Sequence, residues 1–160
     1  MRKIIAQSLS VKTFNEFGSF YNLMAPEGHH LEDFYHDHIL DPVAGNKVMA
    51  FSSLISHKCE HKIITAVEYH NTTGEIILPL DGAVIVHVAP PSNKPVPEMT
   101  EAFLVPAGTM VRLNTGVWHM TPFAVEKEET HIMIGLPERT YFVDCAVINY
   151  EEKDQIEVIL

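Results

Sequence analysis

The chain has 160 residues, a formal net charge of −10 and ten histidines. Hydrophobic residues make up 46% of the sequence and charged residues 20%, which is the composition of a globular chain and not of a disordered one. Because such an acidic chain repels phosphate backbones, we expect no nucleic-acid partner. No apolar run approaches the roughly 20 residues that a membrane span needs, so we expect no membrane partner either.

The length predicts a single domain over residues 1–160, because domains usually contain about 100–200 residues. Cys59 and Cys145 are isolated in the sequence and make no disulfide framework. The N-terminal residues 1–7 include two basic residues but no apolar stretch of signal-peptide length. We therefore expect the protein to work in the reducing environment of the cytoplasm.

The first predicted elements are the end of a strand and one short helix. Ser10 is a suitable N-cap for this helix. Val11, Phe14 and Phe17 recur at helical spacing and form one apolar stripe. Gly18 follows as a helix stop.

Most of the remaining chain has the pattern of β-structure. Residues 21–46 are broken by Pro and Gly and predict a loop region with short strands, and residues 89–100 predict a proline-rich loop. The pair Asp81-Gly82 predicts a hairpin turn. Residues 151–160 predict a final edge strand or a flexible tail. Strands are predicted over residues 47–53, 63–70, 75–80, 83–88, 103–105, 110–113, 117–125, 131–136 and 141–148. Short strands with turn residues between them predict an all-β sandwich or barrel.

A first group of candidate site residues lies around the predicted strand 63–70. Glu68 and His70 are two residues apart, so in a strand they point to the same face. Glu75 opens the next strand after a short turn and can come back alongside them. Imidazole and carboxylate together suit Zn²⁺, Mn²⁺, Ni²⁺ or Fe²⁺. The alternative is that Glu68 and His70 lie on a solvated face.

A second candidate is His119, in the segment Val117-Trp118-His119. Trp118 and His119 face opposite ways if both belong to a strand. If Trp118 packs outside the cavity, His119 points into it. The alternative is a histidine of the core or of the surface.

The first of these segments resembles the first motif of the cupin family. That motif has the form His-x-His, three or four residues, Glu, six residues, Gly. The matching string here is Glu68-x-His70, four residues, Glu75, six residues, Gly82.

The second cupin motif begins with Pro-x-Gly, which residues 106–108 match. A cupin usually has a histidine three residues after that Gly, but the position holds Val111 here. We expect His119 to serve in its place.

The order of features further resembles the ureidoglycolate lyase family, also called ureidoglycolate hydrolase, which is a branch of the cupins. The family's N-terminal pattern Leu/Thr-x-x-x-Phe-x-x-(Tyr/Phe)-Gly is matched by residues 9–18. Its string of Glu-Arg-His, then Gln, then Phe-x-Pro-(Leu/Met)-x-Gly is matched by residues 68–82. Its Val-Trp-His-His-Pro-x-Phe-Ala is matched by residues 117–124. The resemblance covers residues 5–20 and 63–135.

The chain departs from the family pattern at several polar positions. Tyr69 replaces an Arg, Glu75 replaces a Gln and Met120 replaces a His. Pro122 is shifted by one residue. The change at Glu75 makes the site more like that of a metal-binding cupin.

The resemblance implies a single-domain, jelly-roll-like cupin β-barrel with a short N-terminal helix, assembled as a homodimer. It implies a lyase that acts on a small molecule: urea leaves ureidoglycolate and glyoxylate remains, a step of purine (allantoin) nitrogen catabolism. In this interpretation a divalent metal (Zn, Mn, Ni or Fe) is held by Glu68, His70, Glu75 and His119. Glu68 and His119 are then the catalytic groups.

Four further residues are candidates for substrate binding. Arg112 offers a bidentate fork for a substrate carboxylate, and Arg139 is a second candidate for the same role. Tyr69 occupies a position where the family has a polar group. His87 lies on the same face of its strand as Ile85, and that face lines either the cavity or the core.

Two other functions stay open from the sequence. One is a different metal-dependent cupin enzyme that acts on a sugar or sugar acid, which the departures from the family pattern motivate. The other is a non-catalytic cupin that binds a small ligand. Several other histidines are expected on loops, on the surface or between subunits: His29, His30, His36, His38, His57 and His61.

Overall fold

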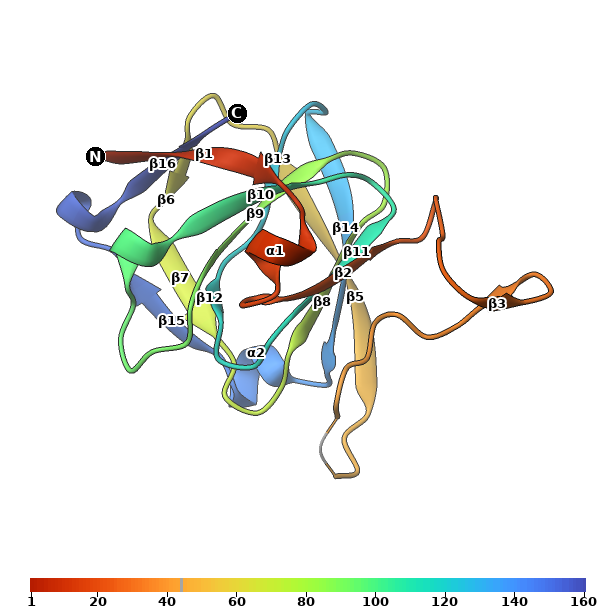
Figure 1. Ribbon diagram of the computed structural model, residues 1–160. Helices are drawn as coiled ribbons and strands as arrows, with labels where there is room; N and C mark the ends of the chain where they lie inside the picture. Colours follow the sequence, from red (N-terminus) through yellow and green to blue (C-terminus); the bar gives the residue numbers. More distant parts are fainter. Residues whose placement is uncertain (44) are drawn as a thin grey trace.

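The computed structural model describes residues 1–43 and 45–160, and in it two curled β-sheets form a half-open barrel (Figure 1). The larger sheet has the order β15-β7-β12-β9-β10-β1-β16-β6, and β13 also pairs with β9. Its strands are β15 (Ala146–Asn149), β7 (Ala66–Tyr69), β12 (Trp118–His119), β9 (Val84–Ala89), β10 (Glu101–Val105), β1 (Arg2–Ser8), β16 (Ile156–Ile159), β6 (Lys62–Ile64) and β13 (Phe123–Ala124).

The smaller sheet has the order β2-β11-β8-β14-β5. Its strands are β2 (Gly18–Asn22), β11 (Thr109–Leu113), β8 (Glu75–Pro79), β14 (Glu129–Pro137) and β5 (Met49–His57). The all-β prediction is therefore confirmed, and so is the short N-terminal helix, α1 (Val11–Phe14). The remaining elements are β3 (His30–Leu31), β4 (Phe34–Tyr35), η1 (Pro97–Met99), α2 (Thr140–Val143) and η2 (Glu152–Asp154).

The start of α1 follows the sequence closely. The Ser10 side chain accepts a hydrogen bond from the Thr13 N–H at 3.2 Å, as expected of an N-cap. The helix ends at Phe14 and not at Gly18, which instead opens β2. A Cβ at Gly18 would lie 1.9 Å from the carbonyl oxygen of Arg112, so only glycine allows the two strands to approach this closely.

The main core fills the space between the sheets. Phe14, Phe17 and Phe103 pack edge to face or tilted at its centre, with 5.0 Å between the ring centroids of Phe14 and Phe103. A second core lies on the opposite face of β9 and contains Ile85 and Trp118. β9 therefore packs on both faces.

The turn at Asp81-Gly82 differs from the prediction. It connects β8 to β9, but these two strands belong to different sheets and do not pair with each other. The expectation of a hairpin was therefore wrong. The chain crosses from one sheet to the other here because both strands are buried and each is already paired on both sides.

Two predictions near the C-terminus also need correction. The expected strand 141–148 begins as a helical turn, α2, and only β15 is extended. Its Tyr141 and Phe142 are 79% and 83% exposed, and in the described part of the chain the strand pairing with β7 begins only at Ala146. The segment 151–160 contains β16, which lies between β1 and β6 and is therefore an internal strand, not an edge strand or a tail.

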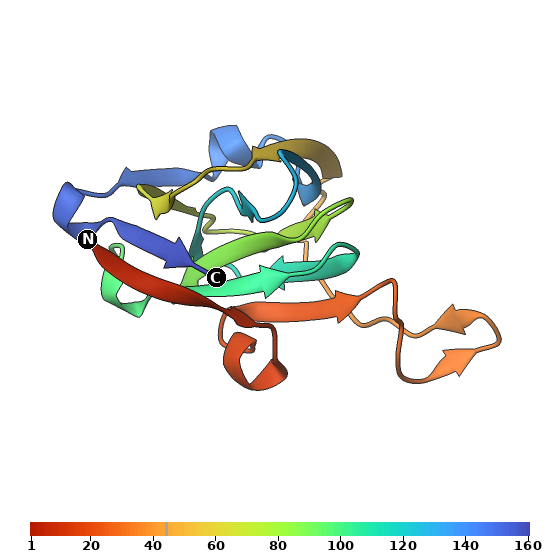
Figure 2. The same ribbon diagram turned by 90° about the horizontal axis from the view of Figure 1, so that it is seen from above.

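Residues 21–46 were expected to form a loop region with short strands. This is confirmed for residues 21–43 and 45–46, and residue 44 lies outside the described residues. The hairpin of β3 and β4 lies in an arm that reaches away from the barrel (Figure 2). None of the helices in the described ranges is long and apolar enough to cross a membrane.

Candidate functional site

Three buried polar side chains meet at one end of the barrel, and they come from both sheets. His70 follows β7, His119 ends β12 and Glu75 opens β8. One carboxylate oxygen of Glu75, Oε2, lies 3.0 Å from the Nε2 atom of each histidine. Glu75 is 7% exposed and each histidine is 3% exposed. The strand alternation predicted for Trp118 and His119 is observed, because Trp118 packs in the second core.

The other ring nitrogen of each histidine is held by the backbone. His70 Nδ1 lies 2.6 Å from the carbonyl oxygen of Asp144, and His119 Nδ1 lies 2.9 Å from the carbonyl oxygen of Val117. A carbonyl only accepts hydrogen bonds, so Nδ1 carries the proton in both rings. In the neutral imidazoles, both Nε2 lone pairs therefore point towards the same carboxylate oxygen.

The buried carboxylate at this centre needs a compensating positive charge. Burial raises the pKa of Glu75, but the charges and hydrogen bonds of His119 and His70 outweigh it and lower the pKa to about 2. Burial lowers the pKa of His119, but the attraction of Glu75 outweighs it and the net shift is upward. The ionised Glu75 is thus compensated either by protons on the imidazoles or by a metal ion between the three groups.

Glu68 completes the group from β7. Its carboxylate and the ring nitrogens of His70 and His119 offer three ligand atoms within 4.8 Å of one another. Two ligand atoms that each lie about 2.1 Å from one ion, at a right angle, are roughly 3 Å apart. The distance from Glu75 Oε2 to the Nε2 atom of each histidine has this value. Two fixed imidazole lone pairs beside two carboxylates are compatible with a first-row divalent metal.

The Cys145 thiol contacts Glu68. Its Sγ donates a hydrogen bond to Oε2 of Glu68 at 2.9 Å. Burial, followed by the hydrogen bond and the charge of Glu68, raises the pKa of this thiol to about 12. Cys145 is therefore a neutral donor at physiological pH and not a thiolate.

Asp144, next to Cys145, fixes the other side of the site. Its carboxylate accepts hydrogen bonds from the backbone N–H groups of Asn71 and Thr72, both at 2.8 Å. Its carbonyl oxygen accepts a hydrogen bond from the Nδ1–H of His70. Sequence reasoning missed both Asp144 and Cys145, since they are more than 70 residues from their partners and belong to no local motif.

A cavity of about 120 Å³ gives access to these groups. Tyr141 lies at its rim and is mostly exposed to solvent. The wall opposite is apolar. The lining residues are Leu54, Glu68, His70, Glu75, Thr121, Pro122, Ile134, Leu136, Tyr141 and Cys145.

None of the four predicted substrate-binding residues is among those that line this cavity: Arg112, Arg139, Tyr69 and His87. Arg112 donates from Nε to Asp41 at 3.0 Å and from Nη1 to Asn114, so its fork is engaged within the protein. Tyr69 packs its ring on Trp118, with 4.4 Å between the centroids. His87 lines a different cavity. Roles of all four in substrate binding stay predictions.

Other histidines lie apart from this centre. His36 and His38 are on the arm, where His38 stacks on Tyr21 with a centroid distance of 3.7 Å. His61 Nδ1 contacts Glu157 at 3.0 Å on the surface of the larger sheet. Among the residues that the structure describes, the one group with three ligands close enough for a metal is the one formed by Glu68, His70 and His119.

The sheets and the buried group of carboxylates and imidazoles define a small β-barrel protein with a polar centre suited to acid–base and metal chemistry. A family model described as ureidoglycolate lyase matches residues 1–157. The chain therefore belongs to the ureidoglycolate lyase family, and the predicted family and enzyme class, a lyase, are confirmed.

Other comparisons are more distant. No curated protein matches the chain significantly. Among solved structures, the chain is similar to one of oxalate decarboxylase, with 14% sequence identity and a TM-score of 0.46. That structure comes from work on the substrate binding mode and reaction specificity of oxalate decarboxylase. The similarity covers 64% of this chain and 24% of that one, so the chain spans about a quarter of the length of oxalate decarboxylase.

Proposed function

We propose that this protein cleaves ureidoglycolate to glyoxylate and urea, as a step of purine (allantoin) nitrogen catabolism, at the centre formed by Glu68, His70, Glu75 and His119. Family membership over residues 1–157 supports the reaction. The observation that carries the proposed site is the pair of 3.0 Å contacts between one buried Glu75 oxygen and two histidines whose other nitrogens are fixed by the backbone.

His70, Glu75 and His119 are the proposed ligands of a divalent metal, which the sequence leaves as Zn, Mn, Ni or Fe. Glu68 is either its fourth ligand or the catalytic base, and the contact of its Oε2 with Cys145 favours the second role. Tautomers fixed at Nδ1 leave Nε2 of His70 and His119 free to bind a cation, and Glu75 supplies the compensating charge. When bound, such an ion supplies Lewis-acid chemistry that lowers the pKa of a coordinated hydroxyl group.

Glu68 is the proposed base. The thiol of Cys145 occupies Oε2, so Oε1 is the oxygen available to receive the proton of the substrate hydroxyl. As the carbon–nitrogen bond breaks, the electron pair of the hydroxyl oxygen forms the aldehyde of glyoxylate. The nitrogen of the leaving urea takes the proton back from Glu68, and the carboxylate is regenerated.

The apolar wall of the cavity supports this role. Leu54, Ile134 and Leu136 limit the water around the reacting groups. In a site with little water, the charges of the carboxylates act more strongly than they would in bulk solvent.

A homodimer in the cytoplasm is proposed on separate grounds. Val147 and Ile148 are half-exposed on β15, an edge strand of the larger sheet, and an exposed apolar edge favours pairing with another chain. Cys59 and Cys145 are both free, which suits a reducing compartment. Light scattering on the purified protein measures the mass in solution, and a monomer of 18.0 kDa at all concentrations contradicts the dimer.

The reaction is tested with the Glu68→Gln variant. Purified protein is incubated with ureidoglycolate and divalent metal, and glyoxylate is measured. We expect kcat to fall by roughly a hundredfold or more, because the amide cannot accept the proton. Glu98→Gln, at an exposed position of η1, is the matched control and retains the wild-type rate. Equal rates for the Glu68 variant and the control contradict the assignment of the base.

A further inference from the structure

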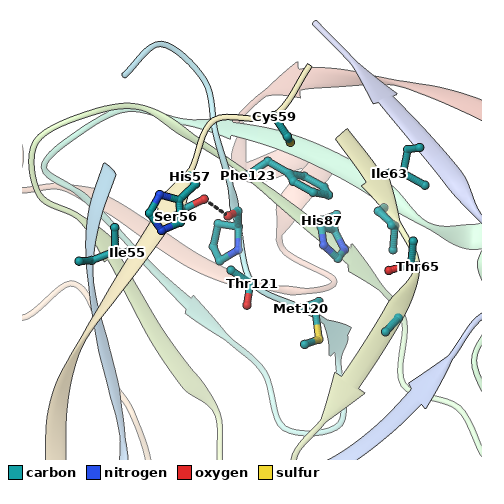
Figure 3. Close-up of a pocket in the computed structure, with 13 residues that line it drawn as sticks. Ile55, Ser56, His57, Cys59, Ile63, Thr65, His87, Met120, Thr121 and Phe123 are labelled. Atoms are coloured by element: carbon teal, nitrogen blue, oxygen red, sulfur yellow. Dashed lines mark hydrogen bonds between the residues drawn. The ribbon is translucent and has the colours of Figure 1, made fainter. Parts of the chain in front are cut away.

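Figure 3 shows the side chains around a second cavity, of about 370 Å³. It lies between β5, β6 and the segment that joins β12 to β13. Thr121 and Pro122 line both cavities and form the wall between them. Its volume falls in the range of roughly 300–1,000 Å³ that is typical of sites for small molecules.

A bulge in the sheet creates this cavity. β12 and β13 both pair with β9, with His119 opposite Val88 and Phe123 opposite Ile85. The chain thus advances from 119 to 123 while β9 moves back from 88 to 85, which leaves one residue more on the side of β12 and β13. The shift of Pro122 by one residue relative to the family pattern falls in this same segment.

The bulge is held in place by β5. The Ser56 hydroxyl donates a hydrogen bond to the carbonyl oxygen of Pro122 at 2.7 Å and accepts one from the N–H of Ala124 at 2.9 Å. Ser56 is 4% exposed, so these bonds are protected from water. The cavity is therefore preformed.

His87 reaches into the cavity from β9. His119 lies opposite Val88, so alternation along the strand places His87 on the other face, away from the catalytic centre. Figure 3 shows its ring between Phe123 and the segment that carries Thr65, which joins β6 to β7. His87 is 1% exposed, and its Nδ1 atom has no hydrogen-bond partner in the part of the chain that the structure describes. A buried nitrogen without a partner is costly, and a bound polar group removes that cost.

The lining determines what kind of molecule fits. The residues described around the cavity include no Asp, Glu, Lys or Arg. Burial lowers the pKa of His87 to about 3, so its ring is neutral at physiological pH. The cavity's second histidine, His57, has its Nδ1 3.6 Å from a carboxylate oxygen of Glu129, so a charge on this ring is paired within the protein. With no unpaired fixed charge to compensate a bound ion, the cavity favours a neutral ligand.

The aromatic side chain at the cavity favours a flat ligand. The ring of Phe123 lies 5.4 Å from that of His87, at an interplanar angle of 34°. Ile63, Met120 and Ala66 supply apolar contacts around these rings. Planar rings pack well against aromatic and thioether side chains of this kind.

We propose that this cavity is a binding site for a neutral, planar nitrogen heterocycle, which packs against Phe123 and forms a hydrogen bond with the ring of His87. The site is separate from the catalytic centre and its existence does not rest on the proposed lyase reaction.

The test uses two probes of the same size and shape. Benzimidazole has one N–H and one acceptor nitrogen, so it can satisfy either tautomer of His87, whereas indene has neither group. Binding to the purified wild-type protein is followed by NMR titration. We expect benzimidazole to saturate with a Kd below about 1 mM and to bind roughly tenfold more tightly than indene.

Three variants locate the site. Ala66→Leu fills the cavity and is expected to abolish binding of both probes, whereas Ala107→Leu, in an exposed turn, leaves both unchanged. His87→Phe is expected to remove the preference for benzimidazole. Thermal unfolding confirms that each variant is folded.

The proposal is overturned by any of three results that involve the wild type or a folded variant. These are a wild-type protein that does not saturate with benzimidazole, equal affinity of the wild type for the two probes, and unchanged binding in Ala66→Leu. The wild-type comparison needs no variant, so the test stands even if one of the variants fails to fold.

Discussion

His87 makes the stability of this protein depend on pH in a way that one substitution can remove. Its ring is fully buried, and burial, followed by repulsion from His119, lowers its pKa to about 3. In the unfolded chain the pKa returns to an ordinary value of about 6.5. His87 therefore binds a proton below about pH 6.5 in the unfolded state, but only below about pH 3 in the folded state.

The magnitude follows from this difference. The contribution of His87 to stability is fully present above pH 6.5 and is lost as the pH falls towards 3. Between pH 7.5 and pH 5, proton uptake by the unfolded chain alone costs about 2 kcal/mol. Phe has a ring of similar shape and takes no proton, so His87→Phe loses about 2 kcal/mol less than the wild type over this interval.

Urea unfolding at pH 7.5 and at pH 5 measures this difference. The quantity compared is the change in the free energy of unfolding between the two pH values, which cancels any constant effect of the substitution on packing. His29→Phe, at an exposed position of the arm, is the matched control and keeps the wild-type pH dependence. Parallel pH dependence of wild type and His87→Phe refutes the reasoning.

Three further predictions concern the supports of the site and the core. Asp144→Asn weakens the charged acceptor of two backbone N–H groups and lowers the free energy of unfolding by about 1–3 kcal/mol in urea. Cys145→Ala removes the hydrogen-bond donor to Glu68 and lowers kcat with little change in KM, whereas Cys145→Ser retains most of the wild-type kcat. An unchanged kcat in Cys145→Ala contradicts this role. Phe14→Ala opens a cavity in the main core and costs about 3–5 kcal/mol by thermal or urea unfolding.

Much of the fold follows from local sequence pattern. The β-branched runs around β8, β9 and β14 alternate or are continuously apolar, and the strands form close to where the pattern places them. Ser10 marks the start of α1 because N-capping depends only on the next few residues. These elements need no information from distant parts of the chain.

The errors occur where distant segments decide the structure. Asp81-Gly82 is a good turn sequence, but which strands it joins depends on the pairing of both sheets. Tyr141 and Phe142 have high strand propensity, yet they lie in α2, and among the described residues the pairing with β7 begins only at Ala146. The internal position of β16 depends on β1 and β6, which are remote in sequence.

The candidate site divides in the same way. Glu68, His70 and Glu75 are close in sequence, and strand alternation together with the family motif indicates their convergence with His119. The contacts of Asp144 and Cys145 with this group were not predictable, because nothing in the local sequence links residue 144 or 145 to the turn after β7. Arg112 was proposed from its chemistry alone, whereas its partner Asp41 lies far away in the sequence.

The central claim is that His70, Glu75 and His119, with Glu68, form a metal-dependent centre for ureidoglycolate cleavage. It is tested most directly by measuring glyoxylate release from ureidoglycolate by chelator-treated protein, with each of Zn²⁺, Mn²⁺, Ni²⁺ and Fe²⁺ added back. We predict release well above the uncatalysed rate with at least one of these ions, and its loss in His119→Ala. Release that never exceeds the uncatalysed rate, or that is equal in the wild type and His119→Ala, contradicts the account.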